Sequence, residues 1–199
     1  ANDFDKNGSI DPVLCQYIEG EEYPVPSRDK LIAQIPPIKV RFNDYKTYAE
    51  ATFSELFKSP EKKGMLVLKA ETFESAYVEN LGEGNFDLKP LPLEMQMAPL
   101  NRFLVEDFDG DGHLDALVVG NSYATEVGIG RYDAFTGALM LGNGGGDFEV
   151  RRGAECGFLA DKDARSLAKV ALKGGDFLYL VGNNSDSLGV FSILTETHP

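Results

Sequence analysis

Histidine and cysteine are scarce in this chain of 199 residues, and basic residues are far fewer than acidic ones. The two histidines are His113 and His198, so no serine, histidine and aspartate arrangement for nucleophilic catalysis has support. The 19 lysines and arginines stand against 32 aspartates and glutamates, which gives a formal net charge of −13. That charge disfavours nucleic acid and anionic membrane surfaces as partners. No apolar run of about twenty residues is present, so we expect no segment of this chain to insert into a membrane.

The two cysteines are Cys15, within an expected strand, and Cys156, near an expected turn. The sequence does not determine whether they pair. We favour two buried free thiols over a disulfide.

The carboxylates gather in one stretch with the sequence DFDGDGHLD, residues 107–115. Alternate residues of a tight loop point into one small volume, where four carboxylates repel each other unless a hard cation is bound. Ca²⁺ suits such an all-oxygen cage better than Mg²⁺ does, because it is larger and accepts looser geometry. Gly112 would allow the sharp turn, and His113 would offer its carbonyl oxygen rather than its imidazole. The expected ligands are Asp107, Asp109, Asp111, His113 and Asp115.

The same pattern, D-x-D-x-D/N-G-x-x-D, opens the chain as DFDKNGSID over residues 3–11. Gly8 again occupies the sixth position. We therefore predict a second Ca²⁺ site, whose expected ligands are Asp3, Asp5, Asn7, Ser9 and Asp11. The alternative for either loop is an acidic surface loop without metal, and the presence of two copies argues against it.

An EF-hand is a poor match for both loops. It requires a bidentate glutamate at position twelve and a helix on each side. Position twelve is Leu14 in the first loop and Val118 in the second. Apolar, strand-like runs follow the loops at 12–18 and 114–119, so each loop leads into a strand.

The region between the loops changes from strand-like to helical periodicity and back. We predict a polar connector at 19–26 and a mainly helical insertion over 20–63, with Ser27 as a helix N-cap. The expected helices are 28–35, 38–42 and 45–57. The expected strands are 65–70, 72–80, 86–91, 103–108, 114–119, 138–141, 148–151, 167–172, 177–181 and 188–194. A long polar loop is expected at 120–137.

Two segments of the chain align as repeats, each with a metal loop, a strand, an insertion and a glycine-rich hairpin. The hairpins correspond as Gly82, Gly84 and Phe86 with Gly144, Gly146 and Phe148. A third unit keeps the strands but lacks the metal loop. The fold predicted is mainly β, a partial or open β-propeller of about three antiparallel blades with a helical insertion. Residues 1–199 would form a single propeller-like domain, part of a larger propeller or an open arc of blades.

These motifs resemble the FG-GAP/VCBS repeat of integrin α-subunit propellers and of many bacterial secreted proteins. The residues that carry the resemblance are 3–11, 80–86, 107–115 and 143–148. The chain also resembles the C-terminal region of bacterial ASPIC/UnbV-associated VCBS-repeat proteins, at 7–12, 26–29, 91–94 and 130–134. Lys6 and Asn7 replace the commoner glycine and aspartate of the pattern, so the first loop has one less charge and is expected to bind more weakly.

The resemblance implies a calcium-braced, exported module for binding or adhesion, with no assigned reaction. We therefore expect a non-catalytic monomer that is secreted, periplasmic or on the outer cell surface. Any export signal would lie upstream of residue 1. Its partner would be a glycan or another surface protein. The alternative is the propeller portion of a secreted enzyme that acts on polysaccharide, which would need a deep cleft with two carboxylates free of calcium.

Overall fold

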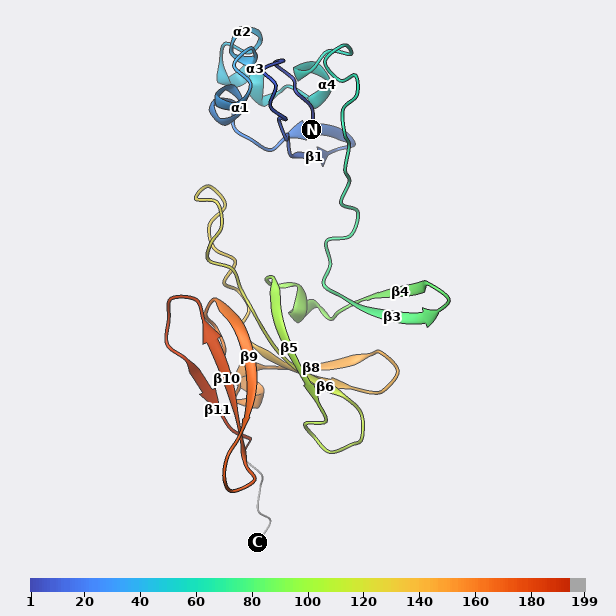
Figure 1. Ribbon diagram of the computed structural model, residues 1–199, viewed down its shortest axis with the longest axis vertical. Helices are drawn as coiled ribbons and strands as arrows, with labels where there is room; N and C mark the ends of the chain where they lie inside the picture. The colour runs from blue at the N-terminus through green and yellow to red at the C-terminus, as the bar shows by residue number, and fades with distance from the viewer. Residues whose placement is uncertain (194–199) are drawn as a thin grey trace. The chain divides into compact units, whose positions relative to one another are not determined.

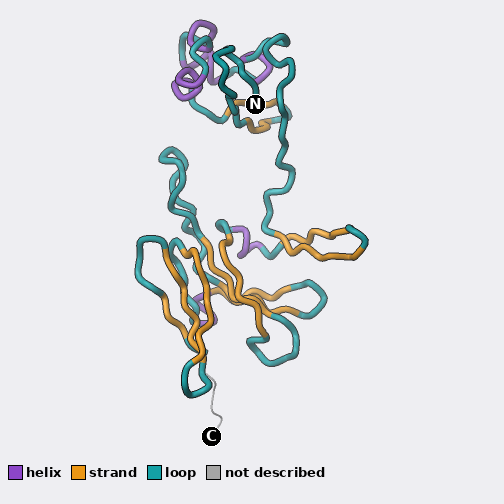
Figure 2. Tube along the Cα trace, in the orientation of Figure 1, coloured by secondary structure: helices purple, strands orange, loops and turns teal. Residues whose placement is uncertain are grey.

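The computed structural model describes residues 1–193, and the chain divides into two compact units, residues 1–71 and 72–199. Figure 1 labels the helices and strands, and Figure 2 colours the chain by secondary structure. Within residues 1–193, no helix has both the length and the apolar character needed to cross a membrane. Leu194 and His198 lie outside the described residues.

The first unit consists of a short hairpin followed by four short helices. The hairpin pairs β1 (Cys15–Ile18) with β2 (Glu21–Pro24) in antiparallel register. The helices are α1 (Arg28–Gln34), α2 (Ile38–Arg41), α3 (Tyr45–Ala49) and α4 (Phe53–Leu56). Most of the core side chains come from the helices and the turns between them, together with Phe4 from the acidic loop: Phe4, Leu31, Ile35, Ile38, Phe42, Tyr48, Ala51, Phe53, Leu56 and Phe57.

Three expectations for this unit are wrong in detail. The expected helix 45–57 is broken, because Thr52 forms a capping box with Glu55 that starts α4 afresh. The expected connector 19–26 contains β2, which pairs with β1 through a tight turn at Gly20. Residues 65–70 form no strand, although their composition favours one, because no neighbouring strand pairs with them in the described structure.

The second unit contains a hairpin, a four-stranded sheet and a three-stranded sheet, all antiparallel (Figure 1). The hairpin is β3 (Ala76–Gly82) with β4 (Asn85–Pro90), followed by the 3-10 helix η1 (Leu93–Gln96). The larger sheet has the order β5 (Leu100–Glu106), β6 (Asp115–Gly120), β7 (Ala138–Gly142) and β8 (Phe148–Arg152). The short helix α5 (Gly153–Cys156) leads to β9 (Ala164–Ala171), β10 (Phe177–Asn183) and β11 (Gly189–Phe191).

Strand β6 is buried on both of its faces. Alternate residues of a strand point to opposite sides of a sheet. Ala116 and Val118 therefore join one core cluster with Met140, while Leu117 and Val119 join another with Tyr179 and Val181. The uninterrupted apolar sequence of this strand follows from its place between the two clusters.

The loop that follows β6 is fixed at its base by Asn121. This residue is 0% exposed and has a left-handed backbone conformation, with φ of 77°. Its side-chain oxygen accepts from the amide of Phe135 at 3.0 Å, and its side-chain nitrogen donates to the carbonyl oxygens of Phe135, Asp161 and Lys162 at 2.7, 3.2 and 3.1 Å. The long polar loop expected at 120–137 is thus anchored at its base.

The predicted fold class is confirmed: the chain is mainly β, with antiparallel sheets that are not closed, as in a partial, open β-propeller. The strands of the first repeat, β1 and β3, belong to separate two-stranded sheets. That residues 1–199 form one propeller-like domain stays a prediction.

Both cysteines are free, but Cys156 is exposed and Cys15 only half-buried, so the expectation that both are buried is wrong.

Candidate metal centres

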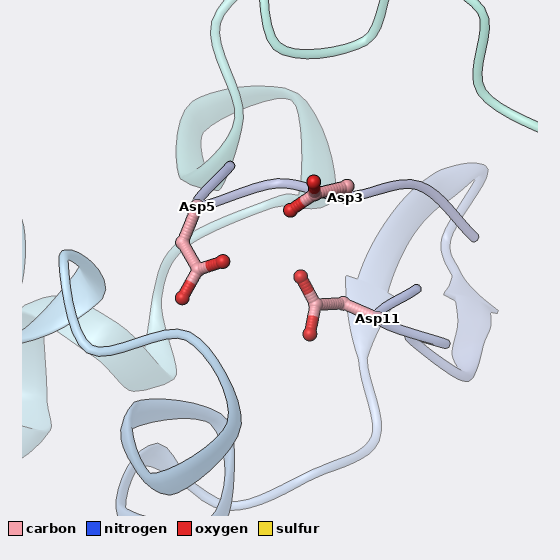
Figure 3. Close-up of side chains that lie close together, drawn as sticks. All are labelled: Asp3, Asp5 and Asp11. Carbon is pink, nitrogen blue, oxygen red and sulfur yellow. The ribbon is translucent and has the colours of Figure 1, made fainter. Parts of the chain in front are cut away.

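The first acidic loop brings three carboxylates together (Figure 3). Asp3, Asp5 and Asp11 each offer an oxygen, and these three oxygens lie within 4.8 Å of one another. Figure 3 shows the three side chains turned toward a common space. Asp11 is only 3% exposed and is held at a bridge to Asn2, where the main chains of the two residues exchange hydrogen bonds.

The second loop repeats this arrangement in the other unit. Oxygens of Asp107, Asp109 and Asp115 also lie within 4.8 Å of one another. Asp107 follows directly on β5, and Asp115 is the first residue of β6 and is 1% exposed. The adjacent antiparallel strands β5 and β6 therefore fix both ends of the loop.

The same backbone amides orient the carboxylates in both loops. The ninth-position carboxylate accepts from the amide of the second residue, Phe4 to Asp11 at 3.1 Å and Phe108 to Asp115 at 2.8 Å. The first-position carboxylate accepts from the sixth-position glycine amide at 3.0 Å in both loops. The two loops thus share these carboxylate–amide hydrogen bonds, which follow from the spacing that they have in common.

A left-handed backbone conformation at two positions allows the tight turn of each acidic loop. The sixth-position glycines, Gly8 and Gly112, have φ of 90° and 91°, as expected from the sequence. The fourth position is also left-handed, with φ of 61° at Lys6 and 82° at Gly110. A lysine in this conformation costs roughly 1–2 kcal/mol, which the glycine of the second loop avoids.

The remaining expected ligands lie beside these trios rather than in them. In the first loop, the Asn7 side chain donates to Asp5 at 3.1 Å and accepts from the amide of Ser9 at 2.7 Å. In the second, Asp111 accepts from the amide of His113 at 2.8 Å, and neither residue belongs to the carboxylate trio. Ligation by Asn7, Ser9, Asp111 and His113 stays a prediction.

The β7–β8 hairpin holds the second loop from outside, a contact that the sequence analysis missed. The amide of Gly142 donates to Asp115 at 2.8 Å. The His113 ring lies against Gly144, where an added Cβ would come within 2.5 Å of Nδ1. The loop and the hairpin together line an open hollow of about 460 Å³. The recurrence of a glycine-rich hairpin after each metal loop was the available signal for this contact.

The chemistry of the two trios fits a hard divalent cation. Both sets contain only carboxylate oxygens, with no thiolate or imidazole nitrogen to favour a softer metal. Ca²⁺ binds oxygens at about 2.3–2.6 Å, so two of its ligands are at most about 5 Å apart. The 4.8 Å limit within each trio is compatible with ligation of one ion by all three carboxylates.

Comparison with known families supports part of the expected resemblance. Residues 101–140 match the FG-GAP repeat. The matched segment contains most of β5, the second acidic loop, β6 and the anchored loop after it. Neither the curated proteins nor the solved structures gave a match. The FG-GAP repeat indicates a module of the propeller class, whereas the VCBS and ASPIC/UnbV resemblance stays a prediction.

Proposed function

We propose that this chain is a non-catalytic binding or adhesion module of an exported bacterial protein, with two loops that are braced by calcium. The single observation that carries the proposal is the recurrence, in both units, of one carboxylate trio that is held by the same two carboxylate–amide hydrogen bonds. One of the two loops lies inside the FG-GAP match.

Calcium would act on the fold by neutralising carboxylates that otherwise repel each other. Asp3, Asp5 and Asp11 would hold one ion, and Asp107, Asp109 and Asp115 the other. Each loop is also attached to a core through the phenylalanine at its second position. Phe4 stacks on Phe57 with ring centroids 4.0 Å apart, so an ordered first loop contributes directly to the packing of its unit.

Export is supported by the FG-GAP match, since such repeats are typical of extracellular proteins. A glycan or another surface protein is the partner that we propose. The anchored loop 120–137 offers exposed side chains for such a contact, among them Val127, Ile129 and Tyr132. Loops on a rigid scaffold are where binding residues concentrate.

The proposal is tested by calcium titration calorimetry combined with thermal unfolding of the full chain, in calcium and in excess chelator. Calcium that binds only the folded state raises the melting temperature with its concentration. We expect Asp5→Ala and Asp109→Ala each to remove one binding event and part of that rise. Asp87→Ala, which removes an exposed carboxylate outside both loops, is the matched control.

A melting temperature that changes neither with calcium nor with chelator would refute the bracing role. Loss of the calcium effect in Asp87→Ala as well would show that it arises from overall charge and not from the loops.

A further inference from the structure

The second acidic loop is joined to the three-stranded sheet at the two residues that flank Asp107. Glu106 accepts from the Tyr179 hydroxyl of β10 at 2.5 Å and from the Lys169 ammonium of β9 at 2.6 Å. The ring of Phe108 packs on the ring of Tyr179, with centroids 5.6 Å apart. Tyr179 therefore contacts the chain on both sides of the first candidate ligand.

Phe108 is held from two directions. Its amide donates to Asp115, a candidate ligand, at 2.8 Å, while its ring lies against Tyr179. Tyr179 itself is 3% exposed, so its ring has little freedom to move away. Burial and the adjacent Glu106 raise the pKa of Tyr179, so its hydroxyl keeps the proton that it donates.

We propose that Glu106 and Phe108 couple cation binding in the 107–115 loop to the stability of the β9–β10–β11 sheet. This inference rests on the proposed function, because it requires that the loop bind calcium. Opening of the sheet withdraws Tyr179 from Phe108 and Glu106 and leaves the start of the loop without its outer support. A loop that has lost this support holds its trio less well, so calcium opposes the opening.

The size of the effect follows from mass action. If opening of the sheet releases the ion, calcium at 100 times its dissociation constant lowers the open population about 100-fold. Amide hydrogen exchange reports this population directly for the strands that open. Exchange of the β9 and β10 amides should then slow by up to about 100-fold when calcium is added.

The experiment measures hydrogen exchange by mass spectrometry on the full chain carrying Asp5→Ala, so that the second loop supplies the calcium binding. Calorimetry on the same protein measures that binding. We expect calcium to slow exchange over 164–183 and to have little effect on the β1–β2 hairpin. Adding Tyr179→Phe removes the hydroxyl donor but keeps the ring, and Phe108→Leu removes the ring contact. Both variants should bind calcium and show a smaller slowing over 164–183.

The matched controls are Tyr132→Phe and Phe103→Leu, which alter exposed rings elsewhere in the same unit. Both should keep the full calcium effect. Calcium binding without any change over 164–183 would overturn the coupling and leave the proposed function intact. Retention of the full slowing in both Tyr179→Phe and Phe108→Leu would overturn the role of these contacts. Absence of calcium binding in this Asp5→Ala background would overturn the coupling and also the proposed calcium site of the second loop.

Discussion

Replacement of Asn121 should destabilise the second unit more than any single change in its exposed loops. In Asn121→Ala, the buried amide of Phe135 loses its acceptor, which costs about 1–3 kcal/mol. The carbonyl oxygens of Phe135, Asp161 and Lys162 lose the Asn121 side-chain amide as their shared donor. This loss costs about 1 kcal/mol of stability for each of the two hydrogens that the amide supplies. Alanine at φ of 77° adds roughly 1 kcal/mol. The expected loss is roughly 4–6 kcal/mol, a large part of the stability of an ordinary domain.

The measurement is urea unfolding followed by circular dichroism, with the two units allowed separate transitions. Asn121→Gly is the matched variant, because it loses the same hydrogen bonds but accepts the left-handed backbone. It should be about 1 kcal/mol more stable than Asn121→Ala. A loss below about 1 kcal/mol in Asn121→Ala would refute the anchoring role, and equal stability of the two variants would refute the backbone contribution.

Two further predictions concern the first unit. Lys6→Gly should raise its free energy of unfolding by up to about 1 kcal/mol in urea, because glycine relieves the left-handed strain at φ of 61°; a lower stability would contradict this. The Arg41 guanidinium holds the pKa of Glu61 below its ordinary 4.5, more than offsetting burial. The pair therefore stabilises the fold above about pH 4.5 and loses this effect as the pH falls through the pKa of Glu61 in the folded state. The stability difference between the protein and Glu61→Gln should shrink between pH 6 and pH 3, and a constant difference would contradict this assignment.

The acidic loops were predictable from sequence because most of the contacts that shape them lie within nine consecutive residues. The carboxylate of Asp107 and the amide of Gly112 are five residues apart, so their spacing alone determines the turn. The outer supports of the same loop were not predictable. Tyr179 lies 73 residues from Glu106, and only the folded sheet brings the two together.

Strand positions show the same division between local and distant causes. Residues 114–119 read as a strand because both faces are apolar, and β6 occupies almost the same range. Residues 65–70 have similar composition but form no strand, since strand formation depends on a neighbouring partner. Asn121 looked like an ordinary loop residue, because its partners, Phe135, Asp161 and Lys162, lie 14 to 41 residues further along the chain.

The burial of β6 on both faces has a consequence for how the second unit unfolds. Its side chains alternate between two core clusters, so the same stretch of backbone belongs to both. If one cluster comes apart while the other keeps β6 in place, apolar side chains of β6 such as Val118 or Val119 become exposed to water. This exposure is unfavourable. Damage to either cluster should therefore lower the stability of both sheets, because each relies on the same strand.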